Sequence, residues 1–186
     1  NGGERNAGGG QRLRGAEGRR GAERGRTDWG AGCERRIFVD QAGQRLAHAG
    51  QLDKGGEPCM RHLERVANAA QARAGHARLI DGLDIDPMRV MQAALLHDVL
   101  EDTPRTAADL RAAGFGTDIV ETVALLTKPA SRIAYSERIT ALIAAGNLAA
   151  LLIKMSDTED NLCPTRIPSN AAFLRERYAT AFGRLK

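Results

Sequence analysis

The stretch from Ala93 to Thr103 places four polar side chains inside a run of apolar ones. It reads Ala-Ala-Leu-Leu-His-Asp-Val-Leu-Glu-Asp-Thr, so a His-Asp pair is followed four residues later by a Glu-Asp pair. On one continuous helix, the two pairs would stack on a single face within about 140° of arc. Burying three carboxylates and an imidazole beside a core is costly unless a cation or partner charges compensate. The pattern therefore predicts a helical segment that binds a cation; the alternative is four solvated polar side chains with no site.

The rest of the sequence favours helix over strand. The chain has 186 residues, enough for one domain with a single core, and only 4% of them are aromatic. Alanine and leucine are abundant, and no alternating apolar-polar run occurs after Ile37. We therefore predict an all-α helical bundle over residues 37–186. We expect its helices at roughly 36–49, 59–74, 87–102, 106–114, 117–127, 133–145, 147–163 and 169–184.

Several helix boundaries carry their own sequence signals. Asp86 precedes Pro87, which suits a cap followed by proline at the first helical position. Thr106 is followed three residues later by Asp109, a pattern typical of a capping box. Glycine often follows the last residue of a helix, and three glycines stand where we expect helices to end, Gly75, Gly114 and Gly146.

The net charge of +4 belongs to the first 36 residues, which hold nine arginines against five acidic residues. Residues 37–186 are therefore neutral overall. The first segment is also rich in glycine and has few large apolar residues, so it cannot bury enough surface to offset the entropy of ordering. We predict a disordered Arg/Gly-rich tail over residues 1–36. Weak RNA contact through this tail, with Trp29 stacking on a base, is less favoured than a leader without function.

Three cysteines in no Cys-x-x-Cys spacing indicate neither a disulfide framework nor a thiolate zinc site. No apolar stretch approaches the ~20 residues that a bilayer requires. The N-terminus also lacks the apolar region of a signal peptide. We therefore expect a cytoplasmic protein without membrane association.

Two further segments contribute polar residues of interest. His62 lies in an amphipathic run after a glycine-rich loop, and taken alone it is better explained as a half-buried structural side chain. Lys154, Asp157 and Asn161 follow a hydrophobic helix at spacings of three and four, so they share one face. Combined with the His-Asp pair, His62 and Asp157 complete a set of two imidazoles and two carboxylates. Such a set suits a divalent metal with open water positions, and its lack of cysteine argues against a closed structural zinc site.

The order of His62, His97-Asp98 and Asp157 resembles the HD-domain metal-dependent phosphohydrolases. The His-Asp-x-x-Glu-Asp form is narrower than a bare His-Asp pair, and the chain is more closely similar to the hydrolase domain of the RelA/SpoT alarmone enzymes and their small stand-alone relatives. The resemblance runs from about Ala47 to Asn161. It rests on Ala47-His48-Ala49-Gly50-Gln51, Lys54, Gly56, Pro58, the His62 segment, Ala93 to Thr103, Thr106, Leu110, Thr127-Lys128 and Lys154 to Asn161.

The resemblance implies an HD-domain helical bundle and a role for each matching residue. His62, His97, Asp98 and Asp157 would bind a divalent ion, most simply Mn²⁺. Glu101 and Asp102 would position and activate the attacking water. Lys54, Lys154 and Asn161 would lie in the nucleotide site. The implied reaction releases pyrophosphate from the 3′ position of a guanosine polyphosphate.

The sequence departs from the family pattern at the first loop, where Asp53 stands in place of the usual arginine before Lys54. An anion there repels phosphate, which favours a second hypothesis, hydrolysis of another phosphorylated nucleotide. A third hypothesis is a nucleotide sensor or RNA-associated module that binds a metal without catalysis. Glu101 and Asp102 argue against it, because binding alone needs no water activator. The C-terminal aromatics Phe173, Tyr178 and Phe182 either close the core or form a homodimer contact.

Overall fold

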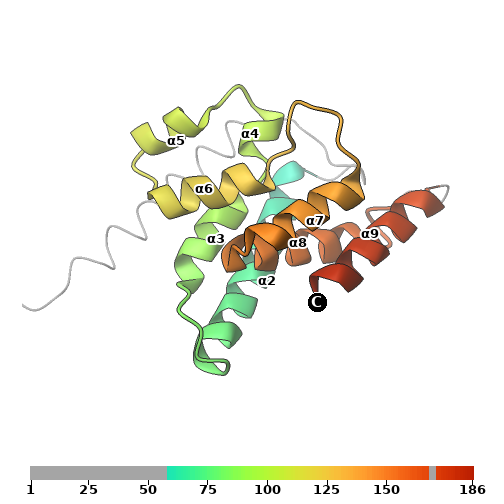
Figure 1. Cartoon of the computed structure of the whole chain (residues 1–186), viewed down its shortest axis with the longest axis horizontal. Coiled ribbons are helices and arrows are strands. Elements are labelled where there is room, and N and C mark those ends of the chain that lie inside the picture. The colour runs from blue at the N-terminus through green and yellow to red at the C-terminus, as the bar shows by residue number, and fades with distance from the viewer. Residues whose placement is uncertain (1–57, 168–170) are drawn as a thin grey trace, which may run out of the picture.

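The computed structural model describes residues 58–167 and 171–186, and within these ranges the chain forms helices and no strand (Figure 1). This confirms the all-α prediction. The predicted tail over residues 1–36, the domain boundary at residue 37, and the first-loop residues Asp53 and Lys54 lie outside the described ranges. The helices are α2 (Cys59–Leu79), α3 (Pro87–Leu95), α4 (Val99–Asp102), α5 (Ala107–Ala112), α6 (Thr117–Leu126), α7 (Tyr135–Ala145), α8 (Leu148–Asn161) and α9 (Ala172–Leu185).

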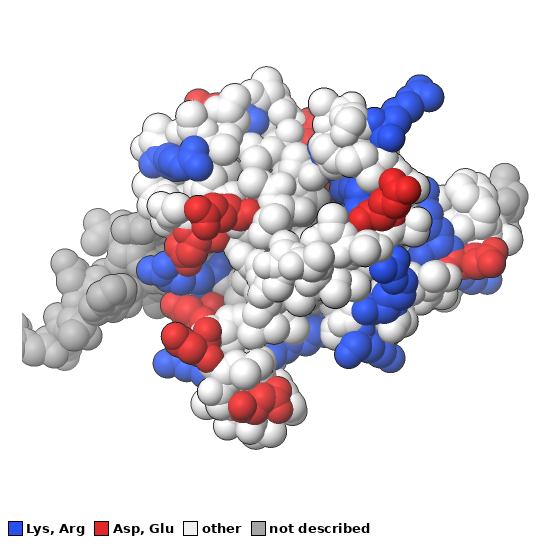
Figure 2. Space-filling model, in the orientation of Figure 1, with Lys and Arg blue, Asp and Glu red and all other residues white. Residues whose placement is uncertain are grey.

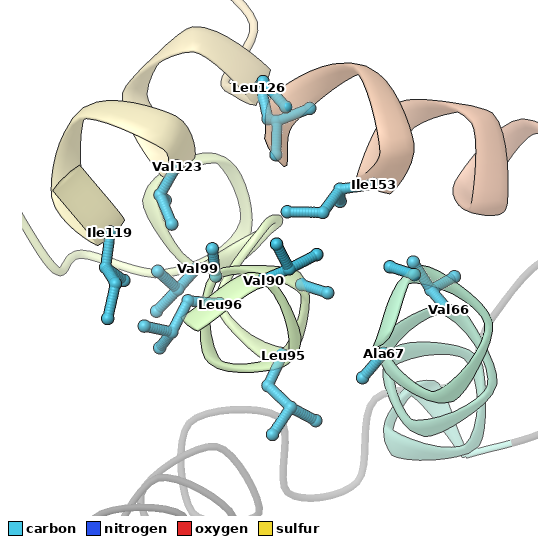
Figure 3. Close-up of a cluster of buried hydrophobic side chains, with 14 of the residues drawn as sticks. Val66, Ala67, Val90, Leu95, Leu96, Val99, Ile119, Val123, Leu126 and Ile153 are labelled. Carbon is cyan, nitrogen blue, oxygen red and sulfur yellow. The ribbon is translucent and has the colours of Figure 1, made fainter. Parts of the chain in front are cut away.

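Helix α2 forms the spine of the bundle and packs along both α3 and α8. The main hydrophobic core lies between these helices and α6, as Figure 3 shows. Val66 of α2, Val90 of α3, Val123 of α6 and Ile153 of α8 are all essentially inaccessible to solvent there. Helix α9 packs on α7 and α8 and encloses a smaller cluster around Tyr178. The packing of α2 against α8 brings together His62 and Asp157, the first and last of the predicted metal ligands.

The predicted boundary signals act as expected at three helices. The Asp86 side chain accepts a hydrogen bond from the Met88 N–H, and Pro87 is the first residue of α3. Thr106 and Asp109 form both halves of a capping box at α5. Gly146 ends α7 in the left-handed conformation with φ +64°, which glycine adopts without steric cost.

Gly75 does not end its helix, because α2 continues to Leu79. This expectation was wrong, and the chain instead turns at Gly82, with φ +68°. A glycine inside a helix is tolerated where packing of the apolar face compensates for its low propensity, and the face of α2 on either side of Gly75 is buried at Ala74 and Ala77.

The expected continuous helix over 87–102 was also wrong, because residues 96–98 form a turn between α3 and α4. Backbone bonds there reach only three residues back: the His97 N–H donates to the Ala94 carbonyl at 3.4 Å and the Val99 N–H to that of Leu96 at 2.9 Å. The His97 Nδ1–H also donates to the Ala94 carbonyl, at 2.7 Å. In a continuous helix this carbonyl would accept from the Asp98 N–H. The His97 side chain occupies it instead, and the helix is interrupted.

None of the helices described is long and apolar enough to cross a membrane.

Candidate active site

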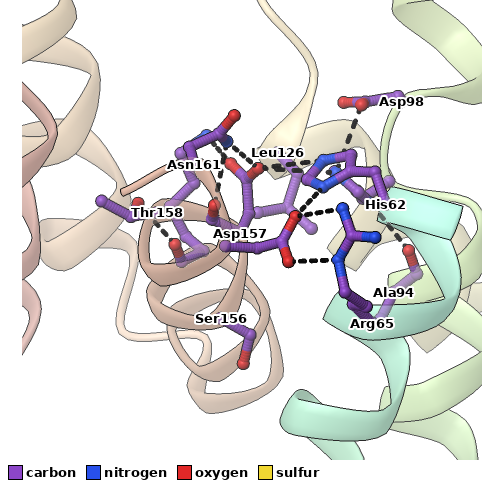
Figure 4. A network of polar contacts seen from close by, with 12 residues as sticks. His62, Arg65, Ala94, Asp98, Leu126, Ser156, Asp157, Thr158 and Asn161 are labelled. Atoms are coloured by element: carbon purple, nitrogen blue, oxygen red, sulfur yellow. Dashed lines mark hydrogen bonds and ion pairs between the residues drawn. The ribbon is translucent and has the colours of Figure 1, made fainter. Parts of the chain in front are cut away.

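Four predicted metal ligands converge from three separate parts of the fold, and Figure 4 labels three of them, His62, Asp98 and Asp157. His62 lies in the first turn of α2, His97 and Asp98 lie in the turn between α3 and α4, and Asp157 lies on α8. One potential ligand atom each from His62, His97 and Asp98 lies within 4.8 Å of the others. Asp157 Oδ1 lies 3.3 Å from His62 Nε2 and 3.9 Å from His97 Nε2. We call these four residues the His/Asp cluster.

The tautomer of His97 follows from its backbone contact. Because a carbonyl oxygen can only accept, Nδ1 carries the proton that it donates to Ala94, and Nε2 carries a lone pair. Nε2 is buried and makes no hydrogen bond with any residue that the structure describes. It faces Asp98 Oδ2 at 3.3 Å and Asp157 Oδ1 at 3.9 Å. A lone pair aimed at two carboxylates is unfavourable unless a cation lies among them, so the donor set fits a divalent metal.

The electrostatics of His62 indicate the same preference for positive charge. Burial lowers the pKa of His62, but hydrogen bonds to Asp157 and Asp160 outweigh it and hold the pKa above the usual value. Burial likewise opposes ionisation of Asp157, yet the neighbouring Lys154 charge and His62 hold its pKa well below the usual range. Asp157 therefore stays ionised, as a carboxylate ligand of a metal must be.

Lys154 and Asn161, which we expected in the nucleotide site, both contact Asp157. The Lys154 ammonium donates to Asp157 Oδ2 at 2.6 Å. The Asn161 amide donates to Asp157 Oδ1 at 2.5 Å and to its backbone carbonyl at 2.9 Å. Burial lowers the pKa of Lys154, whereas the Asp157 charge raises it. The net pKa lies above the usual value, so the lysine stays protonated. Both side chains also line the adjoining cavity.

Glu101 and Asp102 lie on the short helix α4, one turn beyond the His-Asp pair, and both are exposed. They line the same cavity as the His/Asp cluster. Glu101 Oε2 accepts a hydrogen bond from the backbone N–H of Lys128 at 3.1 Å, which ties it to the segment between α6 and α7. An exposed carboxylate beside a cation site can accept a proton from water.

The cavity beside the cluster has a volume of about 540 Å³, which is in the range of small-molecule sites. The carboxylates already described form part of its lining. Cations and two aromatic rings complete it, and apart from Lys128, which the family resemblance includes, the sequence analysis did not assign them to the site: Lys128, Tyr135, Arg138, Arg166, Arg177 and Tyr178. Figure 2 shows blue side chains gathered over the side of the molecule formed by α7 and α9. Cations that line the same cavity as a metal site suit a ligand with several negative charges.

Helix α9 contributes the buried side chain of Tyr178 to the lining of this cavity. The Tyr178 ring meets Tyr135 edge to face at 5.9 Å, and the Arg177 guanidinium lies 5.0 Å from the Tyr135 ring centre. Phe173, in contrast, is 66% exposed. Of the two roles considered for the C-terminal aromatics, closing the core therefore fits Tyr178 and does not fit Phe173.

No protein-family model matches the chain. Over 126 residues the chain is 36% identical to the guanosine-3′,5′-bis(diphosphate) 3′-pyrophosphohydrolase of Haemophilus influenzae, covering 63% of this chain and 17% of that protein. The protein of the same name from Vibrio cholerae is 32% identical over 127 residues, covering 63% of this chain and 16% of that protein. The chain thus spans about a sixth of the length of these curated relatives.

Among solved structures, the fold is similar to a metazoan ortholog of SpoT that is described as hydrolysing ppGpp and acting in starvation responses. The TM-score is 0.60 and the sequence identity is 25%, with 81% of this chain and 85% of that chain covered. Unlike the curated relatives, this neighbour is matched over most of its length.

Proposed function

Since the chain is a relative of the RelA/SpoT-type HD-domain hydrolases, we propose that it hydrolyses a guanosine polyphosphate at its 3′-pyrophosphate, yielding GDP and pyrophosphate from ppGpp. The observation that carries this proposal is Nε2 of His97, which carries a lone pair and makes no hydrogen bond within residues 58–167 and 171–186. This nitrogen faces two carboxylates in the lining of a cavity that Glu101 and Asp102 also line.

We propose that His62, His97, Asp98 and Asp157 hold one divalent ion, most simply Mn²⁺. Imidazole and carboxylate donors without cysteine suit such an ion. When bound, the ion supplies Lewis acidity that lowers the pKa of a water and polarises a phosphoryl oxygen. The hydrogen bond from His97 Nδ1 to Ala94 supports this role, because it fixes the ring with Nε2 toward the cavity.

Glu101 is proposed as the group that accepts a proton from the attacking water, and Asp102 as the group that orients the water or Glu101. The water oxygen forms a bond to the phosphorus carried by the 3′ oxygen, and the bond from that phosphorus to the 3′ oxygen breaks. The departing 3′ oxygen takes a proton, so that a free hydroxyl remains. The exposure of Glu101 and its place in the cavity support this assignment.

We propose that the cations lining the cavity bind the phosphates of the substrate. Lys154 would contribute positive charge close to the reacting group while holding Asp157, and Asn161 would hold Asp157 and face the nucleotide. Lys54 is proposed as a further phosphate contact from the first loop. The rings of Tyr135 and Tyr178 add apolar surface, which a nucleoside requires and a simple polyphosphate does not.

A second substrate class follows from the sequence. Asp53 stands where related enzymes carry a cation, and an anion beside the phosphate site would favour a nucleotide of different charge distribution. Other phosphorylated nucleotides therefore belong in the same assay as ppGpp.

The test is separation of nucleotides after incubation of the purified chain with ppGpp, with Mn²⁺ or with a chelator. We expect GDP and pyrophosphate only with the metal, and at least a hundredfold slower release in Asp98→Asn. Asp118→Asn is the matched control, because Asp118 is an exposed carboxylate paired with Arg89 on another part of the surface. Intact ppGpp with a folded, Mn²⁺-binding wild-type protein would contradict the proposed substrate.

A further inference from the structure

His62 contacts a second carboxylate on the side of the ring that faces away from His97. Its Nδ1 lies 2.7 Å from Asp160 Oδ2, while its Nε2 faces Asp157 at 3.3 Å. Both nitrogens face carboxylates, so the protonated ring donates to both; in the neutral ring the proton stays with the shorter contact, from Nδ1 to Asp160, and the lone pair is on Nε2. Asp160 is on α8, three residues after Asp157, and its side chain is 11% exposed.

Asp160 is itself held by two arginines from different parts of the fold. Arg65, one turn beyond His62 on α2, donates through Nε to Asp160 Oδ1 at 2.6 Å and through Nη2 to Oδ2 at 3.3 Å. Arg166, buried in the segment after α8, donates through Nη1 to Oδ2 and also lies against His62 Nδ1. Both carboxylate oxygens thus have donors, which fixes the orientation of the acceptor that faces His62. Figure 4 shows Arg65 beside this network.

We propose that Asp160 is a positioning residue for the metal site: it fixes His62 in the tautomer whose Nε2 lone pair faces the cation, and Arg65 and Arg166 hold Asp160 in place. Carboxylates that accept from the second nitrogen of a ligating histidine orient the ring and raise its basicity. The inference rests on the proposed function in so far as a cation binds the His/Asp cluster, since Asp160 acts only through His62.

The two histidines of the cluster are then oriented in different ways. His97 donates to a backbone carbonyl within its own turn, whereas His62 donates to a charged side chain on another helix. The His62 arrangement joins α2, α8 and the segment after α8 around one imidazole. Folding of an Asp160 variant must therefore be checked beside its metal affinity.

The first readout is the affinity for Mn²⁺, measured by titration calorimetry on the full chain. We expect Asp160→Asn to weaken Mn²⁺ binding about 10- to 100-fold, because an amide cannot accept from both arginines and from His62. Glu159→Gln is the matched control, because this neighbouring carboxylate has the same charge but pairs with Arg73. It should change the affinity less than twofold.

The second readout does not need the metal. Nitrogen and carbon NMR of the imidazoles in metal-free protein, at alkaline pH where His62 is neutral, reports which ring nitrogen carries the proton; a His62→Asn sample assigns the signal. We expect the Nδ1–H form in the wild type and a shift toward Nε2–H in Asp160→Asn. Wild-type His62 in the Nε2–H form, or Asp160→Asn with an unchanged tautomer and Mn²⁺ affinity, would overturn the inference.

Two outcomes separate this inference from the function on which it rests. A wild type that binds no Mn²⁺ would contradict the proposed function, and the tautomer measurement alone would then decide the role of Asp160. If Asp160→Asn does not fold, as judged by circular dichroism, Arg65→Gln replaces it, because Arg65 is 41% exposed and holds Asp160 from outside. We expect a several-fold loss of Mn²⁺ affinity in that variant, and an unchanged affinity would overturn the inference.

Discussion

The imidazole of His97 donates to the carbonyl that a continuous helix would reserve for the backbone N–H of Asp98. One side chain thus has two effects: it interrupts the helix between α3 and α4, and it turns its other nitrogen toward Asp98 and Asp157. The sequence analysis placed these polar groups on one helical face. They share a site instead because the helix breaks at the histidine, which the spacing of residues alone did not reveal.

The role of Glu101 as the acceptor of the water proton can be tested by one substitution. Glu101→Gln keeps the length of the side chain and an oxygen that can accept from the Lys128 N–H, but it removes the basic carboxylate. We expect kcat for ppGpp hydrolysis to fall about 10²- to 10⁴-fold, with Mn²⁺ affinity unchanged within twofold. Steady-state kinetics and calorimetry on the same samples check both values.

Glu121→Gln is the control for that variant, because Glu121 is an exposed carboxylate of α6 that does not line the cavity. It should leave kcat unchanged. Full activity in Glu101→Gln would show that another group accepts the proton, and Asp102 would be the next to test.

Imidazole and carboxylate side chains are common ligands of divalent ions. The sequence alone could therefore indicate the candidate ligands His62, His97, Asp98 and Asp157. Asp160 and Arg166 could not be assigned in the same way. Asp160 follows Asp157 by three residues, which places both near one face of α8, and this spacing was an available signal. The contact with Arg166 depends on how the chain turns after α8, which no local pattern determines.

At the scale of elements, local capping chemistry predicted the starts of α3 and α5 well, because the interactions involve residues within one turn. Gly75 was assigned wrongly for the same local reason: a glycine signals a helix end, but the burial of Ala74 and Ala77 against the core continues α2 beyond it. Tertiary packing therefore outweighed propensity at this position.

Gly75 and Gly146 form a matched pair for testing these backbone arguments. An added Cβ meets no atom within 4 Å at either position, but Gly146 has φ +64° whereas Gly75 is helical. We expect Gly75→Ala to raise the free energy of unfolding by about 0.5–1 kcal/mol. Gly146→Ala should lower it by about 1–2 kcal/mol. Urea denaturation of both variants measures the two values, and a destabilised Gly75→Ala would contradict the helical account of this segment.

At the scale of the whole molecule, the site exists because α2 packs against both α3 and α8. That packing brings residues 62, 97–98 and 157 to one place. Arg138 of α7, Lys154 of α8 and Arg177 of α9 line the same cavity. An all-α fold could be predicted from composition and periodicity, but the meeting of acidic and basic side chains around one cavity required the three-dimensional arrangement.

In the proposed reaction, water attacks the phosphorus bonded to the 3′ oxygen of a guanosine polyphosphate in this cavity. Mass spectrometry of the products formed from ppGpp by the wild-type chain with Mn²⁺ in ¹⁸O-labelled water locates the attacked atom. We predict one ¹⁸O atom in the pyrophosphate and none in the GDP. Release of orthophosphate, label in the nucleoside, or no product from a folded and Mn²⁺-bound protein would contradict the account.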